Sequence, residues 1–356
     1  MALSDFWSGK RVLITGHTGL KGAWAWAWLE QMGAQVSGLS LAPETTPNLA
    51  NILGLTQRPT SFIGDIRDRE AVMRVVEQVQ PEFVLHMAAQ ALVRRSYREP
   101  IETFDINVRG TLTVLDALRK VRDLKACLVV TSDKVYENND LGRRFNEDDR
   151  LGGADPYSAS KAACEIATSS FARSYFDGKQ TGSSLAAVAT ARSGNVIGGG
   201  DWSEDRIIPD VWRARQNGIK VALRFPLATR PWQHVLDPVA GYLMFLQAMG
   251  EGLDDRTLNF GPVDEASVTV AGVVEAFQST YGSAQSVGWQ QARGAQLKEA
   301  KILAIDATHA VRRLGWQPRL APHRAIDWTA QWYAAYDRGD DMVAFTRNQI
   351  KAYENG

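Results

Sequence analysis

Residues 11–24 read RVLITGHTGLKGAW, an apolar stretch that runs into three regularly spaced glycines. The residues Arg11–Thr15 have the composition of a buried β-strand, and helical periodicity begins after the glycines. Gly16, Gly19 and Gly22 therefore form a GxxGxxG turn between a strand and a helix. A helix N-terminus offers N–H groups and partial positive charge to a pyrophosphate, and glycines permit close backbone approach. The stretch predicts dinucleotide binding, with a simple tight turn as the alternative.

Strand and helix patterns continue to alternate along the first half of the chain. The strands are expected at residues 11–15, 35–40, 60–64, 82–86, 126–131 and 184–191. This alternation predicts an α/β protein with a Rossmann-type, doubly wound parallel sheet. We expect the nucleotide-binding domain to span residues 1–191 and to be completed by a segment near 235–262. Residues 192–234 and 263–356 are punctuated by Pro and Gly and predict a smaller, mostly helical substrate-binding lobe.

Length and composition narrow the class of protein. The 356 residues suffice for two domains, and 40 basic residues balance 40 acidic ones without long runs of either sign. This balance argues against nucleic-acid binding and against a membrane surface. The sequence shows neither a signal-peptide pattern nor an apolar run of membrane-spanning length. Cys127 and Cys164 are the only cysteines, and the five histidines lack metal-ligand spacing, so we expect a cytoplasmic protein without a metal.

The segment after the second strand bears on the choice of dinucleotide. An acidic residue about twenty positions after the glycines usually grips the adenosine ribose, but this chain has GLSLAPETTP there. Ser40 ends the strand and Glu44 follows, so the sequence does not identify the residue that contacts the ribose. A 2′-phosphate would need a basic residue, and none occurs from Met32 through Gln57, which favours NAD over NADP. Asp65 either meets the adenine ring or caps the next helix.

Two groups of polar residues indicate a catalytic site. The sequence TSDKVY ends the fifth predicted strand and presents Ser132, Asp133 and Lys134 in succession. Tyr157 and Lys161 have YxxxK spacing at the start of a predicted helix, where positions i and i+4 share a face. A lysine ammonium beside a tyrosine favours the phenolate form, which can act as a general base for a hydroxyl group.

These motifs together carry a family resemblance. Gly16, Gly19, Gly22, Ser132, Tyr157 and Lys161 resemble the extended short-chain dehydrogenase/reductase superfamily. The stretches GHTGLKG, TSDKVYEN, SGNVIGGGDW and RPWQHVL resemble, within it, the CDP-glucose 4,6-dehydratases. The resemblance implies a redox-neutral lyase that uses NAD and a nucleotide-sugar substrate. The assignment of cytidine as the base rests on these four sequence stretches, because no residue can be identified from the sequence as a contact to the base.

The resemblance also implies roles for the residues of the catalytic site. Tyr157 takes the proton of the sugar 4-hydroxyl while Ser132 hydrogen-bonds the same oxygen. Asp133 is the expected acid for the leaving 6-hydroxyl, and Lys134 is the expected base at C5, where related dehydratases carry a glutamate. A lysine is a base only when neutral, which burial near Lys161 would favour. The alternative is a surface Asp–Lys pair at a strand end.

Further contacts follow from the motif match. The expected cofactor contacts are His17, Thr18, Leu20, Ile66, Ala88, Ala89, Gln90 and Asn107, in addition to Ser40 and Asp65. For Ala88 and Ala89 close packing is the alternative, and for Asn107 an ordinary polar helix position. Lys21 either adds charge near the phosphates or is solvated. Asn195, Arg206 and Arg230 are expected to bind the nucleotide diphosphate, with structural salt bridges as the alternative.

Two other functions remain compatible with the superfamily motifs. A nucleotide-sugar 4-epimerase needs no acid and base beside Ser132, so Asp133 and Lys134 favour dehydration. A non-catalytic NAD-binding regulator would be expected to lose Tyr157 or Lys161. The helix after Tyr157 carries small and apolar residues at Ala162, Ala163, Ile166, Ala167 and Ser170. They predict a homodimer or homotetramer built on a helix bundle, as the superfamily resemblance also implies.

Overall fold

The computed structural model describes residues 3–138, 142–178, 185–262, 268–282, 286–292 and 304–356. Within these residues, seven strands form one sheet in the order β11-β6-β5-β4-β1-β2-β3, and every pairing in it is parallel. The strands are β1 (Arg11–Thr15), β2 (Gln35–Ser40), β3 (Ser61–Ile63), β4 (Phe83–His86), β5 (Ala126–Val130), β6 (Ala187–Ser193) and β11 (Thr257–Phe260). The predicted Rossmann-type fold is confirmed.

The predicted strands agree with the observed ones except near their ends. The sixth strand was expected at 184–191, whereas β6 runs on to Ser193, and residue 184 lies outside the described residues. The sheet gains β11 from the segment near 235–262, beside β6. The proposed division into a nucleotide-binding domain and a substrate lobe stays a prediction.

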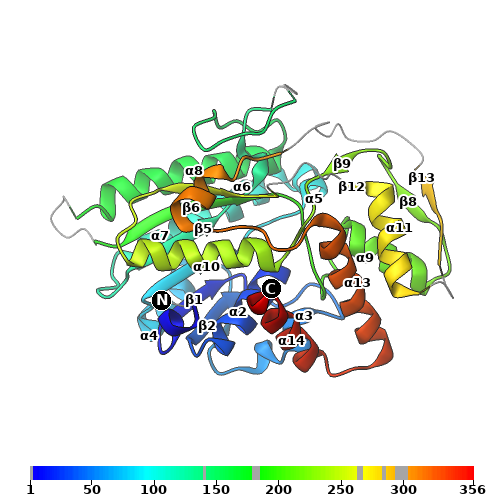
Figure 1. Ribbon diagram of the computed structural model, residues 1–356. Helices are drawn as coiled ribbons and strands as arrows, with labels where there is room; N and C mark the ends of the chain where they lie inside the picture. The colour runs from blue at the N-terminus through cyan, green and yellow to red at the C-terminus, as the bar shows by residue number, and fades with distance from the viewer. Residues whose placement is uncertain (1–2, 139–141, 179–184, 263–267, 283–285, 293–303) are drawn as a thin grey trace.

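Helices cover both faces of the sheet, because successive residues of each buried strand point to opposite sides. Leu13, Val84 and Cys127 pack on the face with α4 (Arg69–Val79), α7 (Thr111–Leu118) and α8 (Pro156–Tyr175). Ile14, Leu85 and Leu128 pack on the face with α2 (Leu20–Gln31) and α10 (Leu236–Gly250). Figure 1 shows α8 and α10 on opposite sides of the sheet.

The alternating tryptophans of α2 are core residues. Trp24, Trp26 and Trp28 are 0–2 % exposed, so they pack within the protein and cannot stack on a ligand. The Trp24 indole donates a hydrogen bond to the Gly199 carbonyl (3.0 Å), and the Trp28 indole donates one to Glu354 (2.7 Å). Glu354 belongs to α14 (Met342–Asn355), so the last helix packs against α2.

A second group, made of three helices and the short strands, lies beside one end of the sheet (Figure 1). Its helices are α9 (Ile207–Gln216), α11 (Val270–Tyr281) and α13 (Pro322–Arg338). The short strands are β7 (Val196–Ile197), β8 (Val221–Leu223), β9 (Thr229–Arg230), β10 (Gln233–His234), β12 (Val268–Thr269) and β13 (Trp289–Gln291). The other helices are α1 (Leu3–Trp7), α3 (Leu49–Ile52), α5 (Val93–Arg98), α6 (Pro100–Phe104), α12 (Thr308–Leu314), the 3₁₀ helices η1 (Leu55–Gln57) and η3 (Asp133–Val135), and the π-helix η2 (Asp105–Gly110).

Candidate active site

A cavity of about 1020 Å³ lies at the carboxyl edge of the sheet. Residues at or just beyond the strand ends line it, among them Gly16, Ser40, Met87, Thr131 and Ser193. β1 and β4 are neighbours there although two strands separate them in the chain, which makes this the topological switch point. Ligands of doubly wound sheets bind at such a point. The volume is at the upper end of the range of roughly 300–1,000 Å³ typical of ligand sites.

A smaller hollow of about 180 Å³ continues the cavity toward the second group of elements. Asn195, Arg206 and Arg230 line both spaces. The three residues predicted to bind the nucleotide diphosphate are therefore brought together. They lie beside the same cavity as the glycine turn.

The glycine turn is shaped for close contact between backbone segments. A Cβ atom at Gly16, whose φ is +80°, would lie 2.7 Å from the Ala88 nitrogen, and one at Gly22 would lie 2.1 Å from the Gly16 oxygen. Larger residues would force the turn away from β4 and α2. Gly19 is the N-cap of α2 and has no side chain to accept the first N–H groups of the helix. These N–H groups lie at the end of α2 that borders the cavity, where they could bind the pyrophosphate of a dinucleotide.

Most of the predicted cofactor contacts line this cavity, but His17 and Asn107 do not. The residues that line it are Gly16, Thr18, Gly19, Leu20, Gly22, Ser40, Asp65, Ile66, Ala88, Ala89, Gln90, Tyr157 and Lys161. The His17 ring instead lies near Trp26, with Nε2 2.7 Å from the Ser61 hydroxyl, and burial lowers its pKa to about 4. Its imidazole is therefore a neutral core group.

The Asn107 side chain is hydrogen-bonded to the loop after β4. Its Oδ1 accepts a hydrogen bond from the Gln90 backbone N–H (2.9 Å), and its Nδ2 donates to the Gln90 carbonyl (3.1 Å) and to the Ser160 hydroxyl (2.8 Å). The residue lies in the π-helix η2, a form of helix frequent at functional sites. In the structure Asn107 thus joins the cavity loop to the helix that carries Tyr157.

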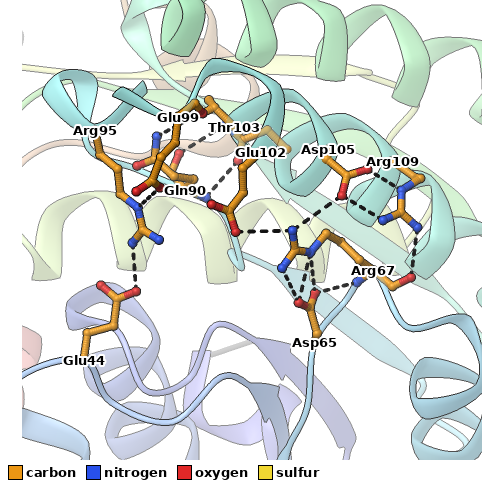
Figure 2. Close-up of polar contacts among 11 residues, drawn as sticks. Glu44, Asp65, Arg67, Gln90, Arg95, Glu99, Glu102, Thr103, Asp105 and Arg109 are labelled. Atoms are coloured by element: carbon orange, nitrogen blue, oxygen red, sulfur yellow. Dashed lines mark hydrogen bonds and ion pairs between the residues drawn. The ribbon is translucent and has the colours of Figure 1, made fainter. Parts of the chain in front are cut away.

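Charged residues surround the end of the cavity that lies near β2 and β3. Arg67 donates from its guanidinium to the Asp65 carboxylate at 2.7 Å and also contacts Glu102 and Asp105 (Figure 2). The Arg67 side chain holds the pKa of Asp65 below its ordinary value. The N-cap of α4 is Asp68, so the alternative of a capping role for Asp65 is wrong.

The loop after β2 is tied across the cavity to α5. Arg95 donates to Glu44 at 2.9 Å and to Glu99 at 2.6 Å, and Figure 2 shows its guanidinium between the two carboxylates. The Ser40 hydroxyl lies 2.7 Å from the Thr18 hydroxyl, which joins the end of β2 to the glycine turn. Glu44 and Ser40 both line the cavity.

Lys21 points into the site and is not a solvated lysine, so that alternative is wrong. Its ammonium donates to the Ser193 hydroxyl at 2.8 Å and to the Tyr242 hydroxyl at 3.4 Å, and Tyr242 donates to Ser193 at 2.6 Å. Burial, followed by the charges of Arg206 and Lys161, lowers the pKa of Lys21 to about 7. Sequence reasoning missed Ser193 and Tyr242, because they lie 172 and 221 positions from Lys21.

The catalytic segment at the end of β5 forms a short hydrogen-bonded turn. Ser132 caps η3 and accepts a hydrogen bond from the Lys134 backbone N–H (3.2 Å). The Ser132 hydroxyl and the Lys134 ammonium both donate to the Asp133 Oδ1, at 3.0 and 2.9 Å. Asp133 is 1 % exposed, and its Oδ2 has no hydrogen-bond partner within the described residues. A Cβ at Gly194, which lines the cavity, would lie 3.0 Å from this oxygen.

Tyr157 and Lys161 lie in the first two turns of α8. Asp155 caps this helix by accepting from the Ser158 N–H (3.0 Å), and Pro156 occupies its first position, which fixes where the helix begins. Tyr157 is 7 % exposed, and the Lys161 ammonium donates to the Val130 carbonyl at 3.3 Å. Both side chains line the cavity together with Ser132 and Lys134. The structure therefore assembles a hydroxyl, a phenol and two amines around one space, while Asp133 is buried next to them and is not part of the cavity lining.

Three further features bear on the class of protein: metal-ligand groups, membrane-spanning helices and the state of the cysteines. Among the described residues, no group of three or more His, Cys, Asp or Glu side chains could hold a metal ion. No helix in the described part of the chain is long and apolar enough to cross a membrane. Cys127 and Cys164 are free and buried.

The fold and the site define an extended short-chain dehydrogenase/reductase with a dinucleotide cleft and a dehydratase-like catalytic segment. The chain belongs to the GDP-mannose 4,6 dehydratase family, whose model matches residues 13–327. It is 41 % identical over 351 residues to the CDP-glucose 4,6-dehydratase of Salmonella typhimurium, covering 98 % of this chain and 97 % of the relative. It is 26 % identical over 330 residues to the human dTDP-D-glucose 4,6-dehydratase, covering 91 % of this chain and 90 % of the relative. These matches confirm the family predicted from the motifs.

Solved structures show the same fold. An epimerase from Methanothermobacter thermautotrophicus superposes with a TM-score of 0.79 at 22 % identity, over 94 % of this chain and 96 % of that one. The dTDP-glucose 4,6-dehydratase of Bacillus anthracis, solved in complex with NAD, gives a TM-score of 0.73 at 22 % identity, over 93 % and 99 %. Dehydratases and epimerases thus share this architecture, and the side chains of the site must decide between them.

Proposed function

We propose that this protein converts CDP-glucose to CDP-4-keto-6-deoxyglucose and water with NAD as a bound, recycled cofactor. The observation that carries the proposal is the Asp133–Lys134 pair, in which Lys134 lines the cavity of Tyr157 and Lys161 and Asp133 lies buried beside Ser132. An acid and a base at this position are what elimination needs and what 4-epimerisation does not. The similarity to the Salmonella CDP-glucose 4,6-dehydratase supports cytidine as the base.

In the first half of the reaction the chain binds the substrate and removes one proton. When bound, NAD supplies a hydride acceptor for the sugar C4 and a hydride donor for C6. The turn at the start of α2 and Ser40 would hold this cofactor. Tyr157 takes the proton of the 4-hydroxyl at its phenolic oxygen, and Lys161 lies one turn further along the same face of α8. Ser132 donates a hydrogen bond to the same sugar oxygen.

In the second half the 4-ketone makes the C5 proton acidic. Lys134 removes this proton at Nζ, and Asp133 gives its proton to the departing 6-hydroxyl, which leaves as water. Lys134 then returns the proton to C5 when C6 is reduced. The contact of 2.9 Å between Lys134 Nζ and Asp133 Oδ1 is an ion pair in the absence of substrate. Transfer of one proton along it turns the pair into a neutral amine and a carboxylic acid. A single proton shift therefore prepares both the base and the acid.

For the substrate nucleotide we propose Asn195, Arg206 and Arg230 as diphosphate-binding residues. Both arginines line the main cavity and the smaller hollow, so they lie along the path from the catalytic segment to the second group of elements. A planar guanidinium suits the oxygens of a diphosphate.

The test is to incubate the protein with CDP-, dTDP-, UDP- and GDP-glucose in separate reactions. Formation of a 4-keto product, detected by its absorbance in alkali, is expected with CDP-glucose. Formation of a 4-epimer and no keto product would support a 4-epimerase instead. Binding of NAD without conversion of any of the four sugars would support a non-catalytic regulator.

We also propose that the protein is a homo-oligomer, a dimer or tetramer, in the cytoplasm. Ile101 of α6 and Ile166 of α8 are 81 % and 61 % exposed, and these helices pack against each other. Large exposed apolar side chains on adjacent helices are typical of a protein interface. Ala162 is buried within the chain, so its predicted place on this surface is wrong. The two free thiols suit a reducing compartment.

A further inference from the structure

Behind the catalytic segment lies a buried ion pair between Glu165 of α8 and Arg192 of β6. The two side chains are 3 % and 4 % exposed and meet through two hydrogen bonds, Nε to Oε1 at 2.9 Å and Nη2 to Oε2 at 3.0 Å. A bidentate contact of this kind fixes the orientation of both planar groups. Both charges are buried, and neither group belongs to the chemistry described above.

Two further hydrogen bonds of the pair go to the two sides of the catalytic segment. The Thr131 hydroxyl donates to Glu165 Oε1, and Thr131 directly precedes Ser132. Arg192 Nη1 donates to the Tyr136 hydroxyl at 2.8 Å, and Tyr136 directly follows Val135, the last residue of η3. Tyr136 in turn donates to Asn259 at 2.7 Å. One ion pair therefore holds the chain immediately before and immediately after Ser132–Val135.

The same pair also connects the segment to the helix that carries the phenol. Glu165 lies one turn beyond Lys161 and two turns beyond Tyr157 on α8, so these three residues share a helix face. Movement of Glu165 would shift the strand end and α8 relative to each other. General acid–base catalysis depends on such relative placement, because proton transfer needs hydrogen-bond distances.

We infer that Glu165 and Arg192 are positioning residues, which hold Ser132, Asp133 and Lys134 in register with Tyr157 and Lys161 by fixing Thr131 and Tyr136. The inference rests on the proposed function for its effect on turnover. The fixing of the segment itself does not depend on the identity of the substrate.

Substitution of Glu165 or Arg192 would leave an unpaired buried charge, so the test uses their partners. Thr131→Val and Tyr136→Phe remove one hydroxyl each and preserve side-chain shape. The matched control is Thr190→Val. The Thr190 hydroxyl also donates a hydrogen bond to Glu165, at 2.6 Å from Oε2, but Thr190 lies in the middle of β6 and does not flank the catalytic segment. All three variants lose a buried hydrogen bond, and only two of them lose one at the catalytic segment.

The first readout is amide hydrogen exchange of residues 131–136 in the ligand-free protein, and the second is kcat and KM with CDP-glucose. Thr131→Val and Tyr136→Phe should exchange faster in this segment than Thr190→Val. They should lower kcat on the order of tenfold or more, with KM little changed. Exchange and kcat indistinguishable from those of Thr190→Val would overturn the inference. If the wild-type protein makes no 4-keto product, the proposed function fails, and the exchange comparison still decides whether the segment is held in this way.

Discussion

The Lys134 ammonium lies 2.9 Å from Asp133 Oδ1, while Oδ2 of the same carboxyl is buried without a partner in the described residues. One oxygen is thus neutralised by the amine, and the other is buried next to the cavity with a hydrogen-bonding capacity that no described residue uses. This asymmetry suits an acid that must face the departing hydroxyl while it remains in contact with the base. It also excludes the alternative of a surface pair, because Asp133 is almost fully buried.

Replacement of Lys134 by Met should stop the reaction at the elimination step. The variant keeps the length of the stem and removes the amine, so the first oxidation should survive. Exchange of the C5 proton with deuterated solvent should fall on the order of a hundredfold or more. Absorbance of the reduced cofactor reports oxidation, and mass spectrometry reports exchange. Lys125→Met, at the exposed opposite end of β5, is the control. Turnover of Lys134→Met at the wild-type rate would mean that another group is the base.

Replacement of Tyr157 by Phe should block the reaction earlier. No other residue of the site is assigned to the 4-hydroxyl proton, so formation of reduced cofactor in a single turnover should fall on the order of a hundredfold or more. Tyr175→Phe removes the same hydroxyl at the other end of α8 and should leave this step unchanged. Normal cofactor reduction by Tyr157→Phe would refute the role of the phenol as the base.

Lys21 should make the stability of the ligand-free protein depend on pH. Its pKa is lowered to about 7 in the folded protein from an ordinary value of 10.5, so between these values the unfolded chain binds more protons. The free energy of unfolding therefore rises with pH across this window, and the cost of burying Lys21 is largest at and below about pH 7. Lys21→Met should raise Tm at pH 7 by about 2 °C or more, and the gain should shrink toward pH 10.

Thermal unfolding of Lys21→Met and the wild-type protein between pH 7 and pH 10 measures this difference. Lys351→Met, an exposed position on α14, controls for loss of a lysine from the surface. A gain in Tm that is the same at every pH would show that Lys21 has an ordinary pKa in the folded protein.

The proposed oligomer should dissociate when its apolar surface is charged. Ile166→Glu and Ile101→Glu place a carboxylate on α8 and α6 and should yield monomers at micromolar concentration in light scattering. Ile219→Glu changes another exposed isoleucine, 58 % exposed, and should leave the mass unchanged. A wild-type protein that is already monomeric under these conditions would contradict the proposal directly.

The sequence was sufficient to predict the parts of this protein that depend on local patterns. The strands around the glycine turn and the YxxxK helix are encoded within a few residues, so their positions could be predicted. The N-cap of α4 could not be predicted, because the stretch GDIRD contains both Asp65 and Asp68. Only the observed start of the helix identifies Asp68 as the cap. The contacts of Lys21 and the Glu165–Arg192 pair also required the structure. Both join segments far apart in the chain, and no local pattern marks Ser193 or Thr131 as a partner.

The most direct test of internal hydride return uses CDP-glucose labelled with deuterium at C4 in ordinary water. Mass spectrometry and NMR then locate the label in the product. The account predicts CDP-4-keto-6-deoxyglucose with deuterium on C6 and no net build-up of reduced NAD over many turnovers. Deuterium lost to solvent, retained at C4 of an epimer, or accumulated in free reduced cofactor in proportion to the product would contradict it.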